Sequence, residues 1–155
     1  MGPSGCGKST IGRLAADRAD AAFVEADDHH TAEARARMKR GDALTDDDRS
    51  PWIARVAEAA NVASRPAVVI ACSALSERVR SELAERLTFP ARFVLLDVPP
   101  EELKRRLTTR AGHFAGPSLL ASQLAALRAS VGVHRVNGML TPEEAARKVA
   151  ALLAG

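Results

Sequence analysis

The residues with the clearest chemical signature lie at the start of the chain. Gly2 through Ser9 read Gly-Pro-Ser-Gly-Cys-Gly-Lys-Ser and fit the pattern G-x-x-x-x-G-K-[ST] throughout. Glycines in such a loop let successive backbone N–H groups turn toward phosphate oxygens, and the helix that follows directs its positive end at the same anion. In this pattern Lys8 reaches the outer phosphates and the Ser9 hydroxyl ligates Mg²⁺. The loop therefore predicts a nucleotide site, without separating a kinase from a GTPase or an ATPase. The residues expected to bind the nucleotide are Gly2, Ser4, Gly5, Cys6, Gly7, Lys8, Ser9 and Thr10.

A second group of reactive side chains, residues 25–30, reads Glu-Ala-Asp-Asp-His-His and follows a short apolar run. A carboxylate at the carboxyl end of a parallel strand lies at the ligand-binding edge of the sheet. Asp27 there either orients an acceptor hydroxyl and takes its proton, or helps to hold a hydrated Mg²⁺. The alternative is an ordinary acidic surface loop. The adjacent histidines lack a third ligand, so the segment does not predict a zinc site.

The elements that position these groups follow from hydrophobic patterning. Short apolar runs at 22–24, 67–71 and 93–96 predict strands, and 131–136 predicts a weaker fourth. Helical spacing of apolar residues recurs at 11–15, 75–87 and 103–107, and a last helix begins with Thr141 as N-cap, Pro142 and the capping-box residue Glu144. Strands that alternate with helices predict an α/β fold with a mostly parallel sheet.

The start of the chain leaves no room for a strand before the phosphate loop. A sheet without that strand would bury unpaired backbone, which is costly. We therefore expect the natural product to start upstream, with Met1 at the end of that strand. Intact-mass analysis of the native protein tests this expectation, and a mass that matches a start at Met1 would contradict it.

Composition limits the classes that remain. The chain has 155 residues, 46% of them hydrophobic and 26% charged, which suits one globular domain. Its two cysteines, Cys6 and Cys72, suggest no disulfide framework and fit a reducing compartment. No apolar run approaches the roughly 18 residues of a membrane helix. The net charge is +3, but aromatic residues are few and not interleaved with the basic ones, so neither a membrane nor a nucleic acid is an expected partner.

With the remaining motifs in view, the sequence resembles the gluconokinase family of small P-loop kinases. That family carries D-G-D-x-L-H-P, then K-M-x-x-G-x-P-L-x-D-x-D-R-x-P-W, and the matching stretches here are 25–31 and 37–52. Its C-S-A-L-K-x-x-Y-R-D block matches Cys72 through Leu75, with Arg80 in the arginine position. Its R-L-x-x-R-x-G-H-F and L-L-x-S-Q blocks match 106–114 and 119–123. These blocks occur in family order over about the first four fifths of the chain.

The resemblance implies a P-loop NTPase fold, a three-layer α/β/α domain over residues 1–155 with a mostly parallel sheet, a helical lid at about 106–127 and the first strand missing. It also implies transfer of the ATP γ-phosphate to the 6-hydroxyl of D-gluconate, with Mg²⁺, in the cytoplasm. The habit of the family suggests a homodimer.

The same resemblance assigns roles to individual residues. Lys8, Asp27, Arg106 and Arg110 are the implied catalytic residues, with the two arginines in the lid over ATP. There they would neutralise charge on the transferring phosphoryl group. The implied metal ligands are Ser9 and Asp27, and the implied substrate ligands are Asp27, His30, Arg49, Arg80, His113 and Gln123. Cys72 is expected to be a small buried residue at a strand end and not a nucleophile.

The sequence departs from the family pattern at several positions: Glu25, Ala26, Thr31, Ala34, Arg37, Ser76 and Val79. These changes bear on the identity of the sugar acid more than on kinase chemistry. Two alternatives therefore stay open: another small-acid kinase of the shikimate type, and a non-catalytic nucleotide-binding module.

Overall fold

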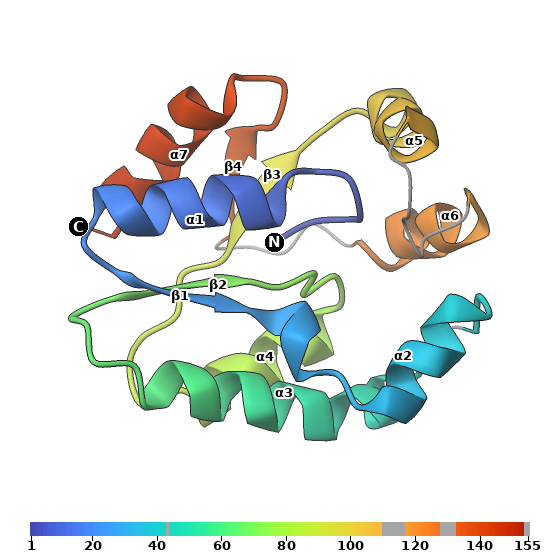
Figure 1. Cartoon of the computed structure of the whole chain (residues 1–155), viewed down its shortest axis with the longest axis horizontal. Coiled ribbons are helices and arrows are strands. Elements are labelled where there is room, and N and C mark those ends of the chain that lie inside the picture. Colours follow the sequence, from blue (N-terminus) through green and yellow to red (C-terminus); the bar gives the residue numbers. More distant parts are fainter. Residues whose placement is uncertain (43, 110–116, 128–132, 154–155) are drawn as a thin grey trace.

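The structure is a computed structural model that describes residues 1–42, 44–109, 117–127 and 133–153. Helices alternate with short strands along most of the chain (Figure 1). In order, the elements are α1 (Lys8–Arg18), β1 (Ala22–Glu25), the 3₁₀ helix η1 (Ala26–His29), α2 (Ala32–Lys39), α3 (Asp46–Asn61), β2 (Val68–Ala71), α4 (Glu77–Arg86), β3 (Val94–Asp97), α5 (Pro100–Thr109), α6 (Pro117–Ala126), β4 (His134–Asn137) and α7 (Pro142–Ala151). Within the described ranges, no helix is long and apolar enough to cross a membrane.

The strands form two separate parallel pairs. β1 pairs with β2, with Ala22 opposite Val68, and β3 pairs with β4, with Val94 opposite His134. The strands predicted at 22–24, 67–71 and 93–96 are confirmed within a residue or two. The fourth is shorter than the predicted run, of which residues 131 and 132 lie outside the described part of the chain.

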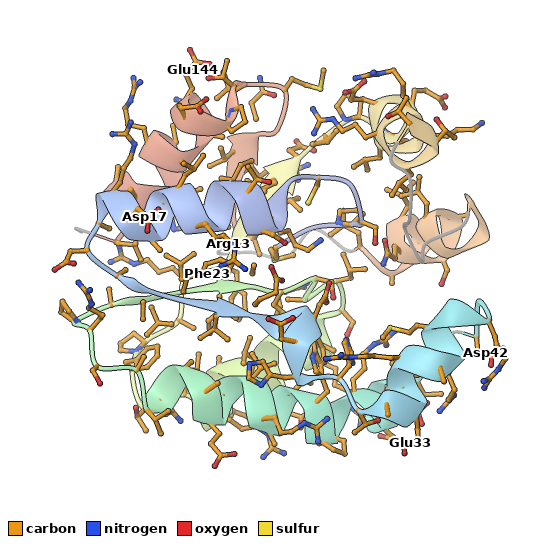
Figure 2. The ribbon with its side chains drawn as sticks, viewed as in Figure 1. Arg13, Asp17, Phe23, Glu33, Asp42 and Glu144 are labelled. Atoms are coloured by element: carbon orange, nitrogen blue, oxygen red, sulfur yellow. The ribbon has the colours of Figure 1, made fainter. Side chains whose placement is uncertain are left out.

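Helices cover both strand pairs and divide the apolar core in two. One core cluster joins β1, β2, α3 and α4, and the other joins the phosphate loop, α1, β3, α5, α6, β4 and α7. α1 contacts α7 on one side and β1 and β2 on the other, so it spans the two halves. The guanidinium of Arg13 lies 4.3 Å from the centroid of the Phe23 ring, and Figure 2 labels this pair between α1 and β1.

Local sequence signals set several helix starts. α7 begins with the predicted capping box between Thr141 and Glu144. α3 begins with a second capping box, between Thr45 and Asp48, so Pro51 lies inside the helix. From the sequence alone, residues 38–52 predict a turn followed by a helix start, with Pro51 near the first turn. That prediction was wrong, because the cap at Thr45 starts the helix six residues before Pro51.

Met1 and Gly2 lie between the two strand pairs and bond to both. The Met1 amine donates to the Val94 carbonyl at 2.6 Å, and the Leu96 N–H donates to the Met1 carbonyl at 3.0 Å. The Gly2 N–H donates to the Ser73 carbonyl at 3.1 Å, just beyond β2. Beyond Met1, the space between the pairs is a cavity of about 460 Å³, lined mainly by apolar side chains. Burial lowers the pKa of the Met1 amine to about 6, so its charge is poorly accommodated there.

A strand fused directly before Met1 is expected to fill this cavity. By the register of Met1 and Gly2, four added residues would run alongside residues 69–72, and a peptide N–H would replace the buried amine. A Val/Ile extension of this length should raise the midpoint of thermal unfolding by about 5 °C or more, because it buries apolar side chains and pairs both strand edges. Circular dichroism measures the midpoint of thermal unfolding, and a variant with a Gly/Ser extension of equal length is the control. Equal midpoints for the two extensions would contradict it.

Candidate active site

The phosphate loop has the backbone geometry that its glycines predict. Gly2, Gly5 and Gly7 all have positive φ angles, of 143°, 83° and 97°. A Cβ added at Gly2 would lie 2.8 Å from the Cys6 sulfur, so the loop curls too tightly there for a side chain. Gly7 stands at the N-cap of α1 and, lacking a side chain, provides no cap. The first N–H groups of α1 are therefore left for a ligand, which is the cradle that a bound phosphate requires.

The side chains at the start of α1 suit the same ligand. Ser9 and Thr10 are exposed on the first turn. The Lys8 ammonium donates to the Pro3 carbonyl at 3.0 Å, which folds the cation back over the loop. The structure thus brings the predicted phosphate-binding residues together in one loop and one helix turn.

A cavity of about 380 Å³ opens directly beside the loop. Its walls come from the phosphate loop and α1, from the end of α5, and from the turn between β4 and α7. The residues lining it are Gly5, Cys6, Gly7, Thr10, Ile11, Arg106, Thr109, Gly138, Leu140 and Pro142. Its volume lies in the range of small-molecule sites. Sequence reasoning missed the turn that contributes Gly138, Leu140 and Pro142, for which the only signal was an Asn-Gly pair after the last strand.

Arg106 is placed in this cavity by an ion pair. Its Nε donates to Glu102 at 2.7 Å, and its Nη2 donates to the Gly138 carbonyl at 3.1 Å. Arg105 bonds the same carboxylate from the exposed side of α5. Hydrogen bonds from Arg105 and Arg106 lower the pKa of Glu102 to about 2, so this carboxylate stays charged and holds Arg106 in place.

The lid helix α6 contacts the phosphate loop through Gln123. The Gln123 Oε1 accepts a hydrogen bond from the Ser4 N–H at 2.8 Å. The role of Gln123 as a substrate ligand stays a prediction, since its described contact is with the phosphate loop. The predicted lid residues Arg110 and His113 lie outside the described residues.

The acidic segment forms the short helix η1 at the end of β1. Asp27 is 73% exposed at its side chain, and its Oδ1 lies 4.0 Å from the Nε2 of His30. The His30 ring is nearly buried and stacks on Trp52 with 4.5 Å between centroids. Burial lowers the pKa of His30, Asp27 raises it, and the nearby cations of Arg35, Arg55 and Arg49 lower it further. The imidazole is therefore neutral near pH 7.

Cys72 stands between the phosphate loop and the acidic segment. Burial raises the pKa of its thiol to about 11, and the charges of Lys8 and Asp27 both act on it. The charges of both groups therefore reach the carboxyl end of β2. The expectation of a buried residue is confirmed, and a protonated thiol is no nucleophile.

Arg49 and Arg80 have different surroundings. Arg49 is partly buried near His30. Arg80 is 4% exposed, and its Nη1 donates to the carbonyls of Ala74 and Leu75 at 3.0 and 2.9 Å. These bonds hold the turn after β2, where Ala74 has a φ of 44°. The role of Arg80 as a substrate ligand stays a prediction, since its described contacts are to backbone.

Comparisons with known proteins agree with this geometry. The model of a family described as an AAA domain matches residues 1–134. The gluconokinase of Arabidopsis thaliana is 34% identical over an alignment that covers 92% of this chain and 84% of the relative. The chain belongs to the gluconokinase family. A crystal structure of a gluconokinase from Sinorhizobium meliloti 1021 superposes with a TM-score of 0.85 at 38% identity, covering 99% of this chain and 89% of that one. The crystal structure of a sugar kinase from Janibacter sp. HTCC2649 superposes with a TM-score of 0.89 at 38% identity, covering 99% of this chain and 91% of that one.

Membership of the gluconokinase family confirms the predicted P-loop kinase fold. It also implies that the phosphate loop binds ATP. Across the described ranges, no three His, Cys, Asp or Glu side chains form a metal cluster. The donors that suit Mg²⁺ are instead the Ser9 hydroxyl and the Asp27 carboxylate, both exposed oxygen ligands.

Replacement of Arg106 by methionine is expected to weaken ATP binding about tenfold, because it removes a cation that lines the nucleotide cavity. Arg105→Met is the matched control, since Arg105 bonds the same Glu102 but does not line the cavity. Isothermal titration calorimetry with Mg-ATP measures the affinity of each variant for ATP. An equal loss in the two variants would contradict this assignment of Arg106.

Proposed function

We propose that this protein is an ATP-dependent gluconokinase that phosphorylates the 6-hydroxyl of D-gluconate to give 6-phospho-D-gluconate and ADP. The observation that carries the proposal is that the segments bearing Lys8 and Asp27 start at the same edge of paired strands: Gly2 bonds Ser73 just beyond β2, and Asp27 lies just beyond β1, which pairs with β2. One group belongs to the phosphate loop and the other to the acidic segment. A phosphoryl donor and a hydroxyl acceptor would meet between them. The relatives named as gluconokinases supply the identity of the acceptor.

The nucleotide half of the reaction rests on the phosphate loop and the 380 Å³ cavity. The uncapped start of α1 and the Lys8 ammonium bind the phosphates, and the cavity beside the loop takes the base and ribose. Arg106 supplies a further positive charge there, and with Lys8 it stabilises charge on the transferring phosphoryl group. Arg110 is proposed for the same role from the lid. Bound Mg²⁺ neutralises charge between the outer phosphates, and Ser9 and Asp27 are its proposed ligands.

The acceptor half rests on the acidic segment. The Asp27 carboxylate is exposed and fixed at the end of β1, so it can accept the proton of the attacking hydroxyl. Around it the charge is positive, because Arg35, Arg49 and Arg55 all act on His30. An anionic acceptor such as gluconate suits this field. Arg49 and neutral His30 are its proposed ligands, and Arg80, His113 and Gln123 complete the set.

We further propose that the protein works in the cytoplasm as a homodimer, with neither nucleic acid nor membrane as a partner. The described cysteines are both free and buried, which fits a reducing compartment. Size-exclusion chromatography with light scattering tests the dimer.

A coupled ADP-release assay with Mg-ATP, with and without D-gluconate, tests the function. Gluconate-dependent turnover is expected. Asp27→Asn should lower kcat at least about 100-fold, because a positioned general base contributes that much. Asp28→Asn, which removes the neighbouring carboxylate of η1, should leave most of the activity.

The alternative outcomes are also informative. Turnover on shikimate but not on gluconate would show that the protein is a small-acid kinase with a different acceptor. ATP binding without turnover on any small acid would show a non-catalytic nucleotide-binding module and overturn the proposal.

A further inference from the structure

The helix η1 is too short to hold its own shape. It has four residues, Ala26–His29, and its hydrogen bonding is that of a 3₁₀ turn, which is weaker than that of an α-helix. It nevertheless carries Asp27, whose carboxylate must stay in place for the proposed proton transfer. The position of Asp27 must therefore depend on contacts from outside the segment.

One such contact comes from α2, where Arg35 donates to the Asp28 carbonyl at 2.7 Å, and the others come from one face of α3. The indole Nε1 of Trp52 donates to the Ala26 carbonyl at 2.6 Å. The same indole stacks on His30, with an angle of 7° between the ring planes. Arg55, three residues further along α3, donates from its Nε to the His29 carbonyl at 2.8 Å. α3 thus holds the residue before Asp27 and the two residues that follow Asp28.

The supporting groups are buried, whereas the reactive carboxylate is exposed. Trp52 is 3% exposed and Ala26 is fully buried, whereas the Asp27 side chain is 73% exposed. The carboxylate thus projects from a backbone whose other side is packed into the core. Trp52 lies beneath this backbone, so it acts on the reaction through Asp27 and His30 and not by contact with an acceptor.

The support itself is rigidly placed. α3 packs through Ile53 and Val56, both 1% exposed, into the core cluster of β1 and β2. Its start is fixed by the Thr45 capping box, and Asp48 of that box also bonds Arg37 of α2 at 2.9 Å. A side chain on such a helix holds its partners within narrow limits, which a loop does not.

From this geometry we infer that Trp52 is a positioning residue of the acceptor site, and that its indole N–H and ring fix the segment bearing Asp27 and His30. Arg55 assists from the next turn of α3. The inference rests on the proposed function for its catalytic consequence, although the structural support of η1 can be measured without turnover. Small displacements of a catalytic group cost much of its effect, so the indole N–H should matter for kcat.

Trp52→Phe tests the inference, because phenylalanine keeps a ring against His30 but loses the N–H donor. We expect kcat to fall about tenfold, with the KM for Mg-ATP changed less than about twofold. Trp52→Leu also loses the ring stacked on His30, so its kcat should fall further. Arg55→Met removes the second support without touching the core and should give a smaller loss of the same kind.

Asn61→Ala is the matched control. Asn61 lies at the far end of α3, where its Nδ2 donates to the Arg86 carbonyl and its Oδ1 accepts from the Thr88 N–H and hydroxyl, so the variant loses side-chain bonds far from η1. Its thermal midpoint should fall as that of Trp52→Phe does, while its kcat stays near wild type. If Trp52→Phe also kept wild-type kcat, or if Asn61→Ala lost as much, the inference would be overturned.

A variant that combines Trp52→Phe with Asp27→Asn separates positioning from general destabilisation. If Trp52 acts through Asp27, Trp52→Phe should have little further effect on the residual rate of the Asp27→Asn enzyme. Independent, multiplicative losses would overturn the assignment.

Hydrogen exchange gives a readout that does not depend on turnover. In Trp52→Phe, exchange of the amides at 26–30 should quicken, and in Asn61→Ala it should not. Unchanged exchange in Trp52→Phe would overturn the inference. If the wild-type chain binds ATP but does not phosphorylate gluconate, the proposed function fails, and the exchange result still decides whether Trp52 holds η1.

Discussion

Much of the structure depends on the backbone pairing of the residues at Met1 and Gly2. Met1 bonds to Val94 and Leu96 on one strand pair, and Gly2 bonds to Ser73 beside the other. These bonds join the two halves at the point where the phosphate loop begins. Because the loop leaves directly from this junction, these backbone hydrogen bonds set where it starts relative to both halves. The nucleotide site and the acceptor site are thereby held at one edge of the molecule.

The features that local sequence determines were predicted well. The phosphate loop, the Thr141 capping box and the apolar strands depend on residues within a few positions of one another, so their spacing alone indicates them. The start of α3 was misjudged because Pro51 was given more weight than the cap at Thr45. Confirmation of the P-loop kinase fold came from the comparisons and from the parallel strand pairs.

Contacts between distant segments could not be predicted from the sequence. Nothing in the spacing of Trp52 shows that its indole meets the Ala26 carbonyl, 26 positions away. The burial of Arg80 was missed for a similar reason: a motif gives its position in the chain, whereas its partners depend on the turn that Ala74 makes after β2. The turn at Gly138 became part of the site only through the packing of α5 against it.

Several of the described arginines form ion pairs with neighbouring carboxylates. Exposed ion pairs on the surface contribute little stability. The pairs away from α5 are Arg37–Asp48, Arg40–Asp42, Arg65–Asp20, Arg78–Asp47, Arg86–Glu82 and Arg135–Asp97. The arginines proposed for recognition are instead those grouped around His30 and the one that lines the cavity beside the phosphate loop.

The two halves of the site also differ in how easily their contacts can be exchanged. On the nucleotide side, the Lys8 ammonium bonds the Pro3 carbonyl, Ser4 bonds the Gln123 amide, and Arg106 bonds the Gly138 carbonyl. All three acceptors are neutral oxygens, and a phosphate oxygen is a stronger acceptor for each of these donors. ATP can therefore replace these bonds at little cost.

On the acceptor side, the bond from Trp52 to Ala26 is buried, and breaking it would leave both groups without a partner. The structure thus combines an adaptable phosphate loop with a fixed backbone at Asp27, the proposed base, an arrangement that would let the donor move into place while the acceptor site keeps its geometry.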